Sequence, residues 1–250
     1  MVANPGSALG EAIGKLFETA ILNGIKQEVE AHEHTVRPAK LTNGSKNTYQ
    51  IDVVIFDKDK NPVIMIDPKY IRYTKHNRDK GSWLCVAHYN LRKTYPSIRK
   101  SIAVLAGRWS EPSKALIKSF GVEILELPFG EMVEILSKWD INFDWNESDS
   151  AAAKKAWKRF DTLSDKERHK IALELTKGIV EHLKADIIRV LETDLSSLPH
   201  RVSQVEVLLK TDQDETLLFT FNNVVSALQG MARLVADRPD IGDLLKPKPH

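Results

Sequence analysis

Two apolar, β-branched segments joined by a short polar turn constrain the fold of this chain more than any other feature. The segments cover residues 49–56 and 62–71, and the sequence between them is DKDKN. Runs rich in Val and Ile that flank turn-forming residues are typical of an antiparallel β-hairpin. The sequence therefore predicts two neighbouring antiparallel strands over these ranges.

Helical and strand-like segments alternate on both sides of this hairpin. Apolar residues at steps of three and four predict a helix over residues 7–23, with Gly24 as its stop. After the hairpin the pattern predicts a helix, a strand, a helix, a strand and a helix. Their ranges are 82–93, 98–105, 113–119, 122–127 and 132–139. This order predicts an α/β fold in which a mixed β-sheet is flanked by helices.

A polar segment suggests where this α/β domain ends. Residues 142–153 are mostly polar or small, so we expect one domain over residues 1–145 and a second over residues 146–250. The second domain is predicted to be mainly helical, with a β-hairpin over residues 202–221 and a final helix. Its functions would be dimerisation, DNA recognition or both.

The first helix of this C-terminal region has a clear start and an apolar stripe. Ser164 and Glu167 have the spacing of a capping box, which places a helix start there. The stripe consists of Ile171, Leu175, Ile179, Leu183 and Ile187. Such a stripe predicts either plain core packing or a subunit interface.

The distribution of charge, rather than its total, predicts an anionic partner. The whole chain has a net charge of +2, yet residues 69–100 hold nine Lys or Arg and a single acid, which gives this segment +8. A strongly basic segment within a nearly neutral chain is typical of a nucleic-acid surface. A solvated basic face is the alternative.

The predicted hairpin also brings acidic side chains together. If its turn is centred between Asp59 and Lys60, Asp52 lies opposite Asp67, and Lys69 shares the face of Asp67. Two carboxylates opposed in an apolar sheet repel each other, and a divalent cation removes that cost. Carboxylate oxygens with few other protein ligands suit Mg²⁺, with Mn²⁺ as a substitute. The alternative is a buried polar cluster in which Lys69 neutralises one carboxylate.

This arrangement resembles the PD-(D/E)XK nuclease superfamily. The matching features are Asp52, the motif Asp67-Pro68-Lys69 fifteen residues later, and the order of helices and strands over roughly residues 7–130. The resemblance implies a restriction-endonuclease-like core that hydrolyses nucleic-acid phosphodiester bonds with Mg²⁺. It makes Asp52 and Asp67 metal ligands and Lys69 the catalytic lysine. Pro68 departs from a regular strand and hints at a bulge or a strand end.

The resemblance also implies an acid on the first helix. Glu18 is the better match and would be a further metal ligand, while Glu11 lies seven residues earlier on nearly the same helix face and competes with it. Basic residues that follow the motif are candidates for contacts with the DNA backbone. They are Lys75, His76, Arg78, Lys80, Arg92, Lys93 and Arg99.

The expected function is that of a Mg²⁺-dependent endodeoxyribonuclease acting on double-stranded DNA, in particular a type II restriction endonuclease. A repair or junction-cutting nuclease, a non-catalytic DNA-binding protein with a nuclease-like core and an RNA-processing enzyme are alternatives. A homodimer is expected because cutting both strands needs two sites. The sequence lacks a Gly-rich phosphate loop and HExxH and GxSxG motifs, which disfavours kinases, ATPases, zinc proteases and esterases.

Composition bears on the cellular location. The single cysteine, Cys85, allows no internal disulfide and fits a reducing cytoplasm. No run approaches the roughly 20 apolar residues that a membrane span requires, and the first residues do not resemble a signal peptide. We therefore expect a cytoplasmic protein that does not insert into a membrane.

Overall fold

The computed structural model describes residues 4–73, 77–146, 148–193, 202–210 and 213–236. These residues fall into two compact units, Met1–Glu192 and Thr193–His250. The expected division at residues 145 and 146 is therefore wrong. The boundary lies after the second of two further helices, because both of these helices pack against the first helix of the chain.

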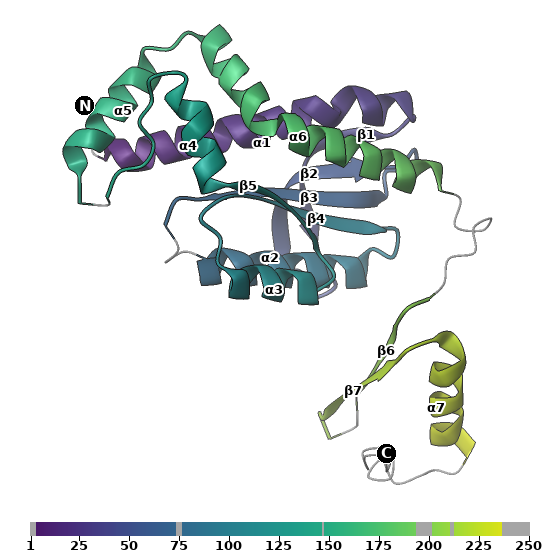
Figure 1. Cartoon of the computed structure of the whole chain (residues 1–250). Coiled ribbons are helices and arrows are strands. Elements are labelled where there is room, and N and C mark those ends of the chain that lie inside the picture. Colours follow the sequence, from purple (N-terminus) through teal and green to yellow (C-terminus); the bar gives the residue numbers. More distant parts are fainter. Residues whose placement is uncertain (1–3, 74–76, 147, 194–201, 211–212, 237–250) are drawn as a thin grey trace. The chain divides into compact units, whose positions relative to one another are not determined.

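The larger unit is built from alternating helices and strands (Figure 1). In chain order its elements are α1 (Pro5–Ala31), β1 (Thr35–Thr42), β2 (Thr48–Phe56), β3 (Pro62–Ile71), α2 (Asn77–Thr94), β4 (Lys100–Gly107), α3 (Glu111–Ser119), β5 (Glu123–Pro128), α4 (Phe129–Ser137), α5 (Ser150–Asp161) and α6 (Asp165–Glu192).

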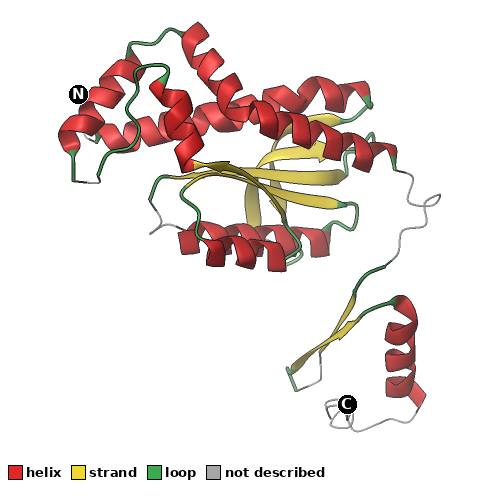
Figure 2. Ribbon diagram, in the orientation of Figure 1, coloured by secondary structure: helices red, strands yellow, loops and turns green. Residues whose placement is uncertain are grey.

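The five strands form one mixed sheet in the order β1-β2-β3-β4-β5. The β1–β2 and β2–β3 pairs are antiparallel, whereas β3–β4 and β4–β5 are parallel. Figures 1 and 2 show α1 and α6 on one face of this sheet and α2 and α3 on the other. The expected α/β fold with a mixed, helix-flanked sheet is thus confirmed.

Apolar side chains of the central hairpin fill the core on both faces of the sheet. Val53 and Ile64 pack with α1 and α6 in the larger core cluster, while Val54 and Met65 pack with α2 in a second cluster. Burial on both faces explains why β2 and β3 read as nearly continuous apolar runs. The central strand β3 is therefore held rigidly between two helical layers.

Helix α1 is longer than the sequence pattern indicates, because it continues through Gly24 to Ala31. Gly24 is the point where α1 and α6 approach most tightly: a Cβ placed there would lie 2.8 Å from Cγ2 of Val180. The glycine therefore allows close helix packing rather than ending the helix.

Strand β1 was not predicted, and it is an edge strand with an irregularity. Its pairing with β2 shifts register between Arg37 and Ala39, where Pro38 lies. Proline lacks a ladder N–H and is tolerated at edges and bulges. Half of the side chains of β1 are polar, so its sequence carries no strong alternating pattern.

Helices α5 and α6 complete the larger unit. The apolar stripe of α6, from Ile171 to Ile187, is buried in the core cluster that also contains α1. Of the two interpretations of that stripe, core packing is the correct one. The capping box is also confirmed, since the Ser164 N–H donates to Oε2 of Glu167 (2.8 Å) and the Glu167 N–H donates to Oγ of Ser164 (3.3 Å).

The smaller unit contains the predicted hairpin and final helix. Strands β6 (Val205–Lys210) and β7 (Thr216–Phe221) pair in antiparallel fashion, and α7 (Val224–Ala236) follows. This confirms the hairpin and the final helix, but the long helix that the sequence assigns to the C-terminal domain is α6 and belongs to the larger unit. Among the described residues of both units, no helix has the length and apolar character needed to cross a membrane.

The tight crossing of α1 and α6 leads to a stability prediction. Gly24→Ala should lower the free energy of unfolding by about 1–2 kcal/mol, because overpacking against the stiff Val180 side chain outweighs the better helix propensity of alanine. Gly10→Ala is the matched control on the same helix, since its Cβ would meet Tyr70 at an ordinary 3.5 Å. Urea denaturation measures both, and a stabilised Gly24→Ala would contradict this account of the crossing.

Candidate metal centre

The register of β2 against β3 agrees with the sequence prediction. Val53 pairs with Ile66 and Val54 with Met65, and the same register continued by one pair places Asp52 opposite Asp67. A register slip of one residue would have turned the two aspartates to opposite faces. The hairpin therefore brings the two carboxylates together as expected.

A bulge in β2 helps to fix this contact. Between the pairs Ala39–Ile51 and Arg37–Val54, two residues of β2 oppose one residue of β1, and Asp52 is one of the two. A bulge interrupts the regular hydrogen-bond ladder and re-aims the side chains beside it. The N–H of Asp52 donates to Oδ1 of Asp67 at 3.3 Å, so this backbone group stabilises the Asp67 carboxylate.

Lys69 bridges the two aspartates. Its Nζ lies 2.6 Å from Oδ2 of Asp52 and 3.1 Å from Oδ1 of Asp67. Asp67 is only 3% exposed, while the side chains of Asp52 and Lys69 are about one quarter exposed. The three residues named by the sequence motif thus form one partly buried charge cluster that reaches the surface.

The charges in this cluster perturb one another. Burial disfavours the charged form of Asp67, yet contacts with His88 and Lys69 outweigh it and hold the pKa of Asp67 well below its usual range. Burial likewise opposes the charge on Lys69, but the neighbouring Asp67 and Asp52 raise its pKa. Both groups are therefore ionised at neutral pH.

Asp52 and Glu18 are shifted in the opposite direction. Burial, followed by the charge of Asp67, raises the pKa of Asp52 despite the nearby ammonium of Lys69. Burial, followed by the charge of Asp52, raises the pKa of Glu18 on α1. Burial therefore disfavours the ionised forms of Asp52 and Glu18 more strongly than the Lys69 ammonium favours them.

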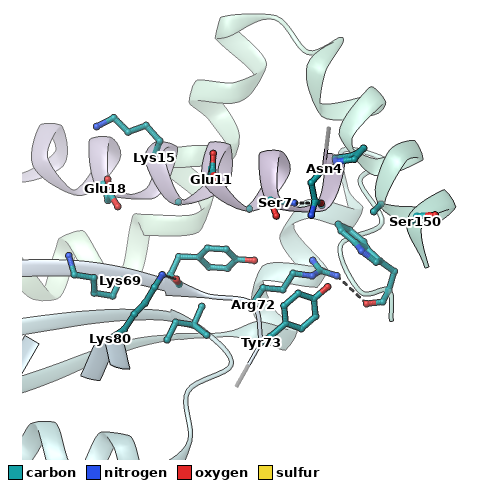
Figure 3. Close-up of a pocket in the computed structure, with 18 residues that line it drawn as sticks. Asn4, Ser7, Glu11, Lys15, Glu18, Lys69, Arg72, Tyr73, Lys80 and Ser150 are labelled. Atoms are coloured by element: carbon teal, nitrogen blue, oxygen red, sulfur yellow. Dashed lines mark hydrogen bonds between the residues drawn. The ribbon is translucent and has the colours of Figure 1, made fainter. Parts of the chain in front are cut away.

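The first-helix acid can be assigned from its surroundings. Glu18 is half-buried and is influenced by Asp52, Asp67 and Lys69, which places it over the cluster. Glu11 is exposed and lies about 10 Å further along the helix axis. Figure 3 shows both acids on α1, with Glu18 nearer to Lys69. Glu18 is therefore the candidate ligand.

His88 belongs to the same cluster, although it was not among the residues predicted from the motif. It is fully buried on α2, and its Nε2 lies 3.6 Å from Oδ2 of Asp67. Its position between Leu84 and Leu91 follows the apolar stripe that α2 turns toward the sheet. A histidine within such a stripe was the available signal, and only the sheet partner reveals its role.

Three carboxyl groups of this cluster are candidate ligands for a divalent cation, although among the described residues it is Glu123, His182 and Asp186 whose ligand atoms lie within 4.8 Å of one another. Asp52, Asp67 and Glu18 offer hard oxygen ligands of the kind that Mg²⁺ prefers. Burial is the main cause of the raised pKa values of Asp52 and Glu18, and the neighbouring carboxylates add to it; a cation would favour their ionised forms. These three carboxylates are the residues that could hold the metal.

The basic residues do not form one continuous surface. Arg78 is exposed near the start of α2, and Nζ of Lys80 donates to the carbonyl oxygen of Tyr70 (3.0 Å) beside the cluster. Lys75 and His76 lie outside the described residues. Only Arg78 and Lys80 among the described candidates therefore lie at the metal-centre end of α2.

The remaining three candidates lie at the other end of α2 and of the sheet. The guanidinium of Arg92 donates to the carbonyl oxygens of Phe120 and Gly121, so it caps the end of α3. Lys93 is near Arg92, with Nζ 5.4 Å from the ring centre of Tyr89. Arg99 precedes β4, where its N–H donates to the carbonyl oxygen of Val63. Val63 and Lys69 are about 20 Å apart along β3.

A second group of metal-binding residue types is an ion-pair network. Single ligand atoms of Glu123, His182 and Asp186 lie within 4.8 Å of one another. Nζ of Lys100 lies 2.6 Å from Glu123 and 3.1 Å from Asp186, so an ammonium bridges these carboxylates as Lys69 bridges Asp52 and Asp67. The network ties α6 to β4 and β5.

Comparisons with known proteins add little to this geometry. No protein-family model and no curated protein match the chain. One solved structure, the protein of unknown function AF1548, is similar with 14% sequence identity and a TM-score of 0.33, covering 67% of this chain and 99% of that chain. The function must therefore be argued from the residues of the chain itself.

The carboxyl pKa shifts predict how metal binding depends on pH. Protons compete with Mg²⁺ for Asp52 and Glu18, so the affinity should fall on acidification, starting above the ordinary carboxyl values of 3.8 and 4.5. Without metal, stability should fall as pH rises through the same interval, since the folded chain holds these protons more tightly than the unfolded chain. Calorimetric Mg²⁺ titrations at several pH values test this, and a constant affinity down to about pH 4 would contradict it.

The contact of His88 with Asp67 predicts a stability effect. His88→Leu removes a polar partner from a buried carboxylate and should lower the free energy of unfolding by about 1–3 kcal/mol. His169→Leu, at an exposed position of α6, is the control and should be close to neutral. Thermal denaturation compares the two, and an unchanged His88→Leu variant would remove His88 from the cluster.

Proposed function

We propose that this chain is a Mg²⁺-dependent nuclease with a restriction-endonuclease-like core. The observation that carries the proposal is the convergence of Asp52, Asp67 and Lys69 within hydrogen-bonding distance in the middle of a mixed sheet. The hairpin, the parallel strands after it and Glu18 on the first helix have the order that the sequence resemblance implies.

Each residue of the cluster has a role in this proposal. Asp52, Asp67 and Glu18 would hold Mg²⁺, which lowers the pKa of a bound water and offsets charge on a phosphoryl oxygen. Lys69 is kept protonated by the two aspartates and would donate a hydrogen bond to the oxygen on which negative charge develops. His88 would hold Asp67 in its orientation from the opposite side.

Double-stranded DNA is the proposed substrate, and its backbone would pass Arg78 and Lys80 at the start of α2. Nζ of Lys80 is anchored beside the end of β3, where the cleaved strand must approach Lys69. Backbone contacts of this kind give affinity that depends on salt but not on sequence. A type II restriction enzyme fits a chain without helicase or ATPase motifs. A repair or junction-cutting nuclease and an RNA-processing enzyme are the alternatives.

The direct test is cleavage of plasmid DNA with Mg²⁺ and with EDTA. We expect cutting that requires the metal and that Asp67→Ala reduces by at least about a hundredfold, while DNA binding persists. Asp59→Ala, in the exposed turn of the same hairpin, is the matched control and should cut normally. Full activity of Asp67→Ala would refute its assignment as a metal ligand.

Two further results would discriminate among the alternatives. Binding without cutting, on DNA of widely mixed sequence and at every salt concentration, would favour a non-catalytic DNA-binding protein. Sequencing the ends of any products separates the enzymatic alternatives. Uniform ends indicate a restriction enzyme, whereas ends located at junctions or lesions indicate a repair nuclease. Cleavage of a panel of RNA substrates tests for an RNA-processing enzyme.

The separated basic residues predict different effects. Lys80→Gln should weaken DNA binding and reduce its salt dependence by about one counterion, as expected for a lost phosphate contact. Arg92→Gln should instead lower thermal stability, because the end of α3 loses its guanidinium cap, with little effect on DNA affinity. Salt-dependent binding curves and melting curves for both variants test this separation, and the reverse pattern would contradict it.

A homodimer is part of the proposal because two-fold symmetry presents two cutting sites to the two strands. The apolar stripe of α6 does not supply the interface, since it is buried within the larger unit. Light scattering gives the mass directly, and the proposal requires twice the 28.3 kDa of one chain.

A further inference from the structure

A cavity of about 810 Å³ extends from the metal centre along α1. Glu18, Lys69 and Lys80 line it near the metal centre, while Arg72 and Trp145 line it elsewhere. Figure 3 shows Lys69 and Arg72 well separated along the cavity, with α1 running past both. The proposed chemistry uses only the part near Lys69, so the part around Arg72 has no assigned role.

Arg72 is an unusual residue for this position. It is only 8% exposed, and its guanidinium carbon lies 3.5 Å from the ring centre of Trp145 and 4.8 Å from that of Phe143. Among the described residues no carboxylate pairs with it, and the nearby Asp144 pairs with Arg108 instead. The aromatic rings therefore hold a buried positive charge in place without neutralising it.

The hydrogen-bonding groups of Arg72 are also incompletely used. Nη2 donates to the carbonyl oxygen of Trp145 (3.2 Å), whereas Nε and Nη1 are buried without a hydrogen-bond partner. A buried donor without a partner costs free energy, and a charged donor costs more. The hydroxyl of Tyr70, which also lines the cavity, is buried and interacts with the guanidinium of Arg72. The guanidinium donors can be satisfied by an anionic acceptor from outside the chain.

The opposite wall of the cavity leaves room for such a group. Gly6, Gly10 and Gly14 lie one turn apart on the α1 face that lines the cavity. None of them is required by tight packing, because an added Cβ would meet its nearest neighbours at 3.5 Å or more. Because glycine has no side chain, these positions leave space on the α1 side of the cavity. The N-terminus of α1 adds an electric field that favours negative charge.

We propose that the Arg72 end of the cavity binds a phosphate group of the nucleotide chain whose cleavage is proposed above. Guanidinium groups bind phosphate through charged hydrogen bonds, and the guanidinium of Arg72 lines this cavity without a carboxylate partner among the described residues. Arg72 follows Lys69 by three residues, or about 10 Å of extended chain. This phosphate is therefore not the one that reacts.

The test measures binding in EDTA, where no cleavage occurs. The probes are a single-stranded oligonucleotide with a 5′-phosphate, the same oligonucleotide with a 5′-hydroxyl, a mononucleotide and inorganic phosphate. Arg72→Met keeps the apolar stem between the rings but removes the charged donors. We expect it to weaken binding of the phosphorylated probes by about tenfold or more, as the loss of a charged hydrogen bond predicts.

Arg37→Met is the matched control. Arg37 also stacks on an aromatic ring, that of Phe56, but lies exposed on β1 outside the cavity lining, and its loss changes the net charge equally. It should leave the affinities within about twofold. Arg72→Lys keeps the positive charge but lacks the guanidinium group, so it should lose part of the affinity for the phosphorylated probes. This variant also tests the proposal if Arg72→Met fails to fold.

The outcomes separate this proposal from the proposed nuclease activity. Equal affinity of wild type and both Arg72 variants would overturn the phosphate site, whatever the plasmid assay shows. A loss specific to Arg72 supports the site even if no DNA is cut. Preference for the 5′-phosphorylated oligonucleotide over its 5′-hydroxyl form indicates a strand end, equal binding indicates an internal phosphate, and binding of the mononucleotide alone would overturn the nucleotide-chain assignment.

Discussion

The contact between two acidic side chains across the β2–β3 hairpin is the constraint on which the rest of this structure depends. Asp52 and Asp67 are close enough that both touch the ammonium of Lys69, yet Asp67 is almost fully buried. Placing like charges together in a partly apolar sheet is costly unless other groups compensate. Lys69, His88 and the N–H of Asp52 compensate the charge of Asp67, whereas burial, followed by neighbouring carboxylates, raises the pKa values of Asp52 and Glu18.

The architecture around the hairpin serves this compensation. A bulge in β2 directs the Asp52 N–H toward Asp67, and α2 covers the other face and supplies His88. Helix α1 crosses above with Glu18, and its glycine face leaves the cavity that leads to Arg72. The buried guanidinium of Arg72 thus lines the same cavity as Glu18 and Lys69 of the cluster. The carboxylates of the cluster and the separate guanidinium of Arg72 suit a ligand that carries both a metal cation and phosphate groups.

The parts predicted correctly from sequence are those set by residues that are close together in the chain. Strand alternation and a compact turn are sufficient to pair Asp52 with Asp67, and the capping box at Ser164 is a local motif. The missed parts depend on partners distant in sequence. Residues 142–153 are polar enough to suggest a boundary, although Phe143 within them is buried in the core. The tight α1–α6 crossing at Gly24, the role of His88 and the capping by Arg92 all require knowledge of the opposing element.

The central claim is that the acidic cluster holds a divalent cation, and anomalous scattering from a crystal grown with Mn²⁺ tests it most directly. Our account predicts a peak within coordinating distance of the carboxylates of Asp52 and Asp67, with Glu18 nearby, and its loss in an Asp67→Asn crystal. A structure in which Nζ of Lys69 still bridges the two aspartates without a metal peak, or in which manganese binds only at Glu123, His182 and Asp186, would contradict it.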